Sequence, residues 1–219
     1  MMKLFIFLLG IGILMPAGEG IAGRLDVSSC PERDVMAPIG RVGFTAGTDQ
    51  ELVQNGDFES ELDYWTEEVN NNQGSHSITR STSYRPGPDY SVRVYKYMRY
   101  FARLYQVVDI PSTDVRFSGQ ARLIASKGTA NGYYAYAALI LDYRNSAGGS
   151  LGRTMILKKV GSYFPENTPT QHIVNVTSNE WEDYSFSIAD ELDNLTGVDP
   201  NEVAAISVIL ESYGTGATG

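Results

Sequence analysis

Residues 91–97 read Ser91-Val92-Arg93-Val94-Tyr95-Lys96-Tyr97, and their side chains alternate in character. The two valines fall on one side of the chain, whereas Arg93, Tyr95 and Tyr97 fall on the other. Such a period of two is typical of a β-strand that has one face buried and one face open to solvent. We therefore predict a strand here, with Val92 and Val94 facing a core.

The same rhythm continues through most of the chain, because short apolar alternations separated by Gly, Pro, Asn and Ser run from residue 51 onward. Only residues 189–195 have a helical pattern, of one or two turns. Further strands are predicted at residues 104–110, 116–124, 133–143, 151–160, 181–188 and 203–211. Many short strands of this kind predict an all-β sandwich.

The N-terminal region is different in character. Lys3 precedes an apolar run over residues 4–15, and a small-residue pattern follows at Gly20-Ile21-Ala22. The run is shorter than a membrane-spanning helix needs. We predict that residues 1–22 are a signal peptide, with an uncleaved anchor as the alternative. Residues 23–50 are predicted to be a linker or loosely ordered arm. The mature protein would then be secreted or held at the cell surface, with no membrane segment.

Composition and motifs exclude several classes of function. The net charge is −9 and no cluster of Lys and Arg occurs, which argues against binding to nucleic acid. The single cysteine, Cys30, allows no disulfide within the chain. The sequence contains no P-loop, Rossmann, G-x-S-x-G or H-E-x-x-H motif. We therefore predict a binding protein and not an enzyme.

A resemblance to a known family rests on four segments in order. The first is Leu52-Val53-Gln54-Asn55-Gly56-Asp57-Phe58-Glu59, followed by Trp65, and the others are residues 90–94, 104–108 and 181–186 with 205–208 after them. Together they resemble carbohydrate-binding modules of families 4, 9 and 22. The resemblance covers residues 51–219 and implies an antiparallel jelly-roll β-sandwich of the galactose-binding-like kind.

One part of that family pattern has no counterpart here. Such modules end in a strand that contains a phenylalanine–aspartate pair, whereas this sequence ends at Gly219, where that strand would begin. We therefore expect a C-terminally truncated sandwich whose neighbouring strand edges are exposed. Further domains of a longer parent protein are possible partners.

The resemblance also implies two sites. A structural Ca²⁺ ion would be held near the first strand by Asp57 and Glu59, since Ca²⁺ prefers oxygen ligands; alternatively, Asn55-Gly56-Asp57 is only a turn. A polysaccharide or oligosaccharide would bind a concave, aromatic-rich sheet face, because aromatic rings stack on sugars while polar groups bond their hydroxyls. The candidate ligand-binding residues are Arg93, Tyr95, Tyr97, Gln106, Gln120, Arg122, Tyr134, Tyr136 and Asp142.

Alternatives remain for these residues and for the whole chain. Tyrosines at alternate strand positions also serve cross-strand packing, and Trp65 and Trp181 are interpreted as packing residues. The first hypothesis for function is a non-catalytic carbohydrate-binding module of an exported or surface protein. The rivals are a structural or adhesive β module that binds no sugar, and an accessory fragment of a secreted glycoside hydrolase.

Overall fold

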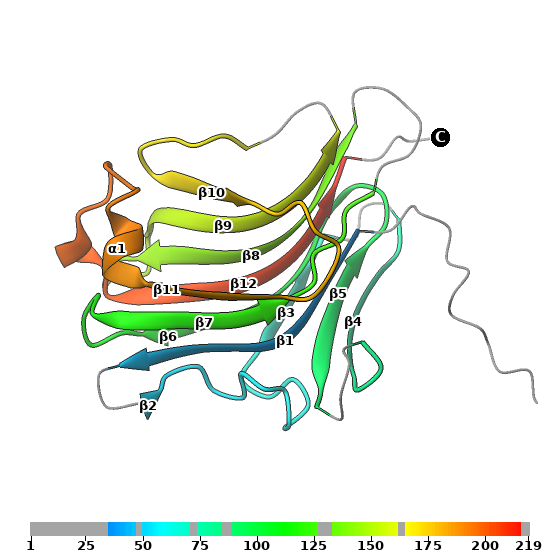
Figure 1. Ribbon diagram of the computed structural model, residues 1–219, viewed down its shortest axis with the longest axis horizontal. Coiled ribbons are helices and arrows are strands. Elements are labelled where there is room, and N and C mark those ends of the chain that lie inside the picture. The colour runs from blue at the N-terminus through cyan, green and yellow to red at the C-terminus, as the bar shows by residue number, and fades with distance from the viewer. Residues whose placement is uncertain are drawn as a thin grey trace, which may run out of the picture. The chain divides into compact units, whose positions relative to one another are not determined.

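Two β-sheets make up most of the chain in the computed structural model, which describes residues 35–46, 50–70, 74–84, 89–126, 133–161 and 165–215 (Figure 1). These residues belong to one compact unit, Pro31–Gly219. In chain order the elements are β1 (Val35–Ala46), β2 (Gln50–Glu51), β3 (Thr66–Val69), β4 (His76–Ser81), β5 (Ser91–Lys96), β6 (Tyr100–Asp109), β7 (Val115–Ala121), β8 (Tyr134–Arg144), β9 (Ser150–Gly161), β10 (Gln171–Asn175), β11 (Glu182–Ser187), α1 (Ile188–Leu192), η2 (Pro200–Glu202) and β12 (Ala205–Gly214).

The strands form two six-stranded sheets, and the predicted all-β sandwich is confirmed. Sheet A has the order β11-β7-β1-β5-β4, with β2 paired to β1, and sheet B has the order β10-β9-β8-β12-β6-β3. Neighbouring strands are antiparallel except for β9 and β10, which are parallel. Figure 1 shows β10, β9, β8 and β12 side by side, with α1 at one end of these strands.

β1 corrects the prediction for residues 23–50. Residues 35–46 of that predicted linker form a strand in the middle of sheet A, paired with β5 on one side and β7 on the other. The pattern was hidden by a shift of register after Ile39. An extra residue in a strand reverses the phase of its alternation, so the buried residues are Ala37 and Ile39 before the shift, and Val42 and Phe44 after it.

The main core lies between the two sheets and follows the predicted alternation. Val92 and Val94 on β5 are fully buried, as are Phe117 and Ala121 on β7. The ring of Phe117 lies 5.4 Å from that of Phe44 and 5.2 Å from that of Phe186, so aromatic contacts join β7 to both of its neighbours in sheet A.

The two tryptophans also pack as predicted. Trp65 is 8% exposed, and its ring centroid lies 5.4 Å from that of Phe58. Its indole nitrogen donates a hydrogen bond to the Asn55 carbonyl oxygen at 3.1 Å. Trp181 is half-buried, and its indole nitrogen donates to the Tyr84 carbonyl oxygen at 3.2 Å.

The short helix α1 confirms the prediction of helical structure in residues 189–195, and its Glu191 ties it to sheet B. The carboxylate of Glu191 accepts a hydrogen bond from Thr154 Oγ1 at 2.7 Å and contacts His172 Nδ1 at 2.5 Å. Asn194 Nδ2 donates to the other carboxylate oxygen at 3.3 Å. Since Glu191 is 8% exposed, these partners satisfy a nearly buried carboxylate.

The predicted signal peptide, residues 1–22, lies outside the described residues, as do residues 23–34 of the predicted arm. The expectation of a further strand beyond Gly219 stays a prediction. In the described part of the chain, no helix has both the length and the hydrophobicity to cross a bilayer.

Candidate functional site

The predicted ligand-binding residues are divided between the two sheets. Arg93 and Tyr95 lie on β5 and Gln120 on β7, which are strands of sheet A. Tyr134, Tyr136 and Asp142 all lie on β8, a strand of sheet B. No single sheet face therefore carries all nine residues.

On sheet A, the predicted residues are engaged by their own neighbours. The Arg93 guanidinium lies 4.9 Å from the ring centroid of Tyr84 and 5.9 Å from that of Tyr95. Such contacts are ordinary cation–π pairs, formed here by a half-buried arginine.

The other predicted polar residues near sheet A are also bonded to neighbouring groups of the protein. Gln120 Nε2 donates to the Asp183 carboxylate at 3.0 Å, and Arg122 Nε donates to the Asn179 carbonyl oxygen at 2.6 Å. Tyr97 follows the end of β5 and is 38% exposed. These positions form part of a polar surface and are absent from the linings of the two pockets described below.

Gln106 on β6 does not face a ligand surface. It is 7% exposed and lies in phase with the core residues Leu104 and Val108. Its Oε1 accepts from the Gln54 amide at 2.8 Å, and its Nε2 donates to the Gln54 carbonyl at 2.8 Å and to the Tyr64 carbonyl at 3.3 Å. The prediction for Gln106 is therefore corrected to an anchor for the chain around residue 54, because its amide satisfies buried backbone groups.

The outer face of sheet B, which points away from the main core, is the best-built candidate surface. Along β8, Ala137, Leu139 and Leu141 face the main core, whereas Ala138 and Ile140 belong to a second apolar cluster. Because side chains alternate along a strand, this second cluster lies on the opposite face. It contains Ala138, Ile140, Met155, Leu157, Ile173 and Ile209, with Tyr105 and Tyr136 packed against it.

Strand register arranges this outer face in rows across the sheet. An aromatic row pairs Tyr136 with Tyr213 and Tyr213 with Phe101. The row next to it pairs Ala138 with Glu211, Glu211 with Arg103 and Arg103 with Glu68. Aromatic and charged side chains therefore lie side by side on β8, β12, β6 and β3.

Three tyrosines of the outer face form a stack. The rings of Tyr136 and Tyr213 lie 4.9 Å apart at an interplanar angle of 8°, and those of Tyr134 and Tyr213 lie 5.6 Å apart at 22°. The stack continues into a pocket of about 440 Å³. Its lining residues are Arg99, Tyr100, Tyr133, Tyr134, Tyr213, Gly214 and Thr215.

Next to the stack, Glu211 is a nearly buried carboxylate with 7% exposure. Its Oε1 accepts from the Tyr136 hydroxyl at 2.6 Å, and its Oε2 lies 3.8 Å from Arg103 Nη1. Arg103 also donates to Glu68 Oε2, at 2.6 Å from Nη2 and 3.0 Å from Nε. Burial raises the pKa of Glu211, against the opposite effects of the Tyr136 bond and of Arg103 and Arg153. Burial and Glu211 together raise the pKa of Tyr136.

Replacing Glu211 with glutamine should change how stability depends on pH. A carboxyl whose pKa is raised by folding stabilises the fold fully below its unfolded pKa of about 4.3, and that contribution is lost as the pH rises through the folded pKa. The wild type should therefore lose stability relative to Glu211→Gln as the pH rises above about 4.3. Urea unfolding of both proteins across pH measures this difference.

Glu67→Gln, which removes an exposed carboxyl from β3, is the matched control. Two results would contradict a raised pKa for Glu211. The stability difference between wild type and Glu211→Gln could stay constant with rising pH, or it could grow in favour of the wild type.

Asp142 lies toward the other end of β8, away from the tyrosine pocket. Its carboxylate accepts from Ser150 Oγ at 2.5 Å and from Arg144 Nε at 2.9 Å. Ser150 also lines a second, more polar pocket of about 480 Å³, together with Leu151, Gly152, Arg153, Thr168, Thr170 and Gln171. Asp142 is eight positions along the extended strand from Tyr134, a distance of roughly 27 Å. The two residues therefore belong to different surroundings.

The metal candidates Asp57 and Glu59 are both exposed. Asp57 Oδ1 accepts the Glu59 amide at 3.3 Å, which is a local turn contact. Within the described residues, no three His, Cys, Asp or Glu side chains come together in a way that could hold a metal ion.

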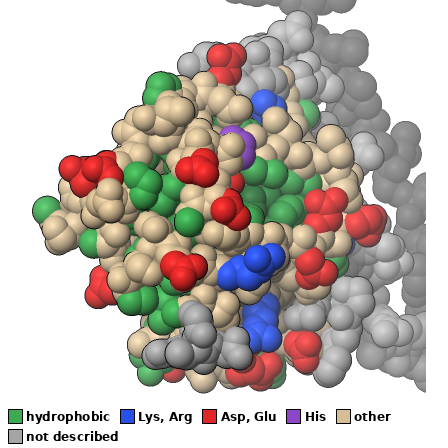
Figure 2. All heavy atoms as spheres, turned by 60° about the vertical axis from the view of Figure 1, so that its left-hand side comes forward, with side chains coloured by type: hydrophobic (Ala, Val, Ile, Leu, Met, Phe, Trp, Pro, Cys, Tyr) green, Lys and Arg blue, Asp and Glu red, His purple; other side chains and the backbone are tan. Residues whose placement is uncertain are grey.

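Acidic and basic side chains are distributed differently over the surface. On the side shown in Figure 2, Asp and Glu side chains are scattered, whereas a small group of Lys and Arg side chains lies beside a patch of hydrophobic ones. On the outer face of sheet B itself, the acidic Glu68 and Glu211 are both within 4 Å of Arg103. Arg103 thus offsets part of the negative charge that Glu68 and Glu211 bring to this face.

Sequence reasoning missed Glu68, Phe101, Arg103, Glu211 and Tyr213 on this face. It also missed the pocket residues Arg99, Tyr100, Tyr133, Gly214 and Thr215. Alternation within β12 could have separated Glu211 and Tyr213 from the buried Leu210. It could not show that β12 lies between β8 and β6, which places those side chains beside Tyr136 and Arg103.

Comparison with known proteins does not identify a family for this chain. No protein-family model matches the chain, and no curated protein matches it in sequence.

Proposed function

We propose that the chain is a non-catalytic carbohydrate-binding module, and that saccharide binds at the tyrosine pocket on the outer face of sheet B. The observation that carries this proposal is the stack of Tyr134, Tyr213 and Tyr136, which runs into a pocket lined by four tyrosines. Sugar rings present apolar C–H faces that pack on aromatic side chains. The Arg99 guanidinium in the same lining can donate to sugar hydroxyls. Thr215 Oγ1 exchanges hydrogen bonds with the Tyr134 backbone at 2.8 Å and 3.0 Å and keeps one lone pair that can accept from a sugar hydroxyl.

The charged row beside the stack supports the same occupant. Arg103, whose side chain is 31% exposed, brings a guanidinium donor to the edge of the aromatic row, and the nearly buried Glu211 contacts both Arg103 and the Tyr136 hydroxyl. Ligand pockets commonly combine apolar and aromatic walls with a few polar groups that fix orientation. A saccharide, which has both apolar faces and many hydroxyls, fits this combination.

The outer face suits a protein partner less well. Stable protein interfaces have an apolar core that is exposed before binding. Here the aliphatic residues of the second cluster are already covered by their neighbours, with Ile140 3% and Ile209 8% exposed. A structural or adhesive module would need more open apolar surface than these residues offer.

In this proposal, residues 1–22 direct export, so that the module acts on polysaccharide outside the cell or at its surface. The proposal includes no catalytic step, because Glu211 is already engaged by Tyr136 and Arg103 in a packed row.

Affinity electrophoresis tests the proposal directly. The protein should migrate more slowly in a native gel that contains soluble xylan, β-glucan or mannan than in a gel without polysaccharide. Bovine serum albumin in the same lanes controls for changes in gel viscosity. Equal migration in all three polysaccharide gels and in the blank gel would count against carbohydrate binding.

A further inference from the structure

The loop over residues 55–65 is tightly wound and needs internal support. Asn55, Phe58, Glu61 and Tyr64 all have positive φ, between 51° and 70°. Left-handed backbone is unfavourable for residues other than glycine. This winding brings backbone carbonyl oxygens close together, and buried or crowded carbonyls need donors.

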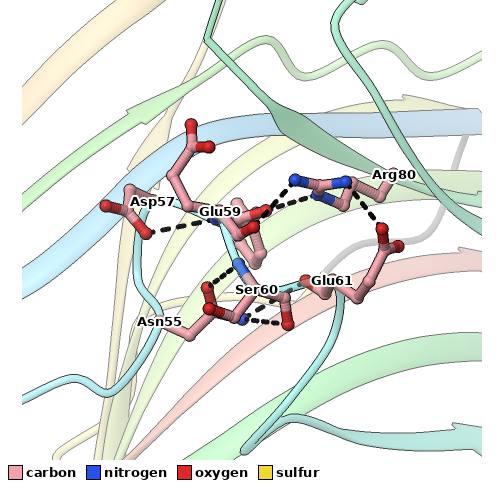
Figure 3. A network of polar contacts seen from close by, with 7 residues as sticks. Asn55, Asp57, Glu59, Ser60, Glu61 and Arg80 are labelled. Carbon is pink, nitrogen blue, oxygen red and sulfur yellow. Dashed lines mark hydrogen bonds and ion pairs between the residues drawn. The ribbon is translucent and has the colours of Figure 1, made fainter.

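Arg80, from β4, supplies those donors (Figure 3). Its Nε donates to the Phe58 carbonyl oxygen, and its Nη2 donates to the Glu59 carbonyl oxygen at 3.0 Å. Its Nη1 forms an ion pair with Glu61 Oε1 at 2.8 Å. The guanidinium also lies 3.1 Å from the ring centroid of Tyr90, and the Arg80 side chain is 11% exposed.

These contacts are of the kind that a loop-bound metal ion makes. Ca²⁺ in proteins is held by backbone carbonyls and carboxylates together. Here two carbonyl oxygens and one carboxylate of the loop converge on a single guanidinium, which carries a fixed positive charge and five N–H donors. Two backbone carbonyl oxygens and the Glu61 carboxylate of the loop are therefore already bound to Arg80 and are not left over for an ion.

The remaining candidate ligands do not form a metal site beside Arg80. Asp57 Oδ1 contacts the Glu59 amide, and Figure 3 shows the Asp57 carboxylate on the far side of the loop from Glu61. The residues present thus fit an arginine better than the calcium ion that the family resemblance implies. We propose that Arg80 acts as the internal cation of the 55–65 loop and that this loop folds without a metal ion.

The inference is independent of the proposed carbohydrate site, which lies on sheet B, whereas β4 belongs to sheet A. Its first test is thermal unfolding of the whole chain in EGTA and in excess CaCl₂. The midpoint temperature of unfolding should be the same in EGTA and in excess CaCl₂. A bound ion at about 100 times its Kd would instead raise the midpoint by roughly 5–10 °C, and such a rise would overturn the proposal.

The second test uses variants. Arg80→Ala should lower the midpoint by at least about 5 °C, and Arg80→Lys should recover only part of the loss, because an ammonium cannot reproduce the guanidinium fork. Arg116→Ala is the matched control, since Arg116 is exposed and donates to the Ser185 hydroxyl at 2.9 Å. Equal midpoints for Arg80→Ala and Arg116→Ala would contradict the inference.

If Arg80→Ala does not fold, that outcome agrees with the proposal, and calorimetric titration of the wild type with CaCl₂ then decides. Absence of binding heat supports a metal-free loop, and saturable binding at one site per chain overturns it.

Discussion

Replacing Asn55 with alanine should lower the free energy of unfolding by roughly 2–4 kcal/mol. Asn55 Oδ1 accepts the Ser60 amide at 2.9 Å. Its Nδ2 lies 3.2 Å from each of the carbonyl oxygens of Ser60, Glu61 and Asp63. One side chain thus closes the 55–65 loop from inside, and alanine can replace none of these bonds.

Backbone strain further lowers the free energy of unfolding of Asn55→Ala. Asn55 has a φ of 51°, which asparagine tolerates better than other residues with a side chain. Alanine at this φ is strained by about 1 kcal/mol. Asn55→Gly removes the side chain without that strain, so it should be less harmful than Asn55→Ala, and the difference between the two measures the conformational part.

Urea unfolding of Asn55→Ala, Asn55→Gly and wild type provides the measurement. Asn201→Ala is the matched control, because Asn201 is exposed and its side-chain amide donates to Asp199 Oδ1 at 3.0 Å. A loss at Asn55 no larger than the loss at Asn201 would mean that the loop is held by other contacts.

Local alternation predicted which way most strands face. Residues 91–97 contain enough of the pattern to place Val92 and Val94 in the core, and both are fully buried. The same phase places Lys96 on the inner side, where it is 1% exposed and burial lowers its pKa. The alternation alone therefore predicts on which face of a strand a side chain lies, even for Lys96, whose residue type suggests the surface.

Alternation fails where the backbone leaves its regular period. β1 contains a register shift after Ile39, and Pro38 precedes it. Proline is unusual in an interior strand, because it lacks an N–H for the ladder. Here the Pro38 carbonyl accepts the Arg122 amide just beyond the last residue of β7, so the missing donor falls at the end of the ladder. Sequence reasoning could not anticipate this compensation.

The candidate site needed information that no single strand holds. Tyr95 and Tyr136 occupy equivalent outward positions in their own strands, yet β5 belongs to sheet A and β8 to sheet B. Sheet membership depends on pairing between residues far apart in the chain, such as Tyr136 with Tyr213. The pattern predicted outward aromatic residues correctly but could not assign them to a common face.

This division between sheets makes a sharp test of the proposed function. Replacing Tyr213 with alanine should weaken binding to the retarding polysaccharide by about 30-fold or more, which corresponds to the roughly 2 kcal/mol or more lost at a central aromatic contact. Tyr213 lies between Tyr134 and Tyr136 in the stack and lines the pocket. Its removal takes away one aromatic wall and leaves the other two rings without their common neighbour.

Tyr95→Ala is the matched control, because Tyr95 is also a half-buried, outward tyrosine, but on the opposite sheet. It should keep the retardation of the wild type. Tyr213→Phe preserves the ring and should keep most of the affinity, which separates stacking from hydroxyl bonding. Affinity gels over a range of polysaccharide concentrations give the dissociation constants, and near-ultraviolet circular dichroism checks that each variant is folded.

The two tyrosine variants also discriminate between faces of the sandwich. If Tyr95→Ala abolishes retardation while Tyr213→Ala retains it, saccharide binds sheet A and the assignment to sheet B is wrong. If Tyr213→Ala fails to fold, Tyr134→Ala replaces it, since Tyr134 lines the same pocket at the end of the stack. Loss of retardation in a folded Tyr134 or Tyr213 variant, with Tyr95→Ala unchanged, is the result expected if the aromatic row provides the binding surface.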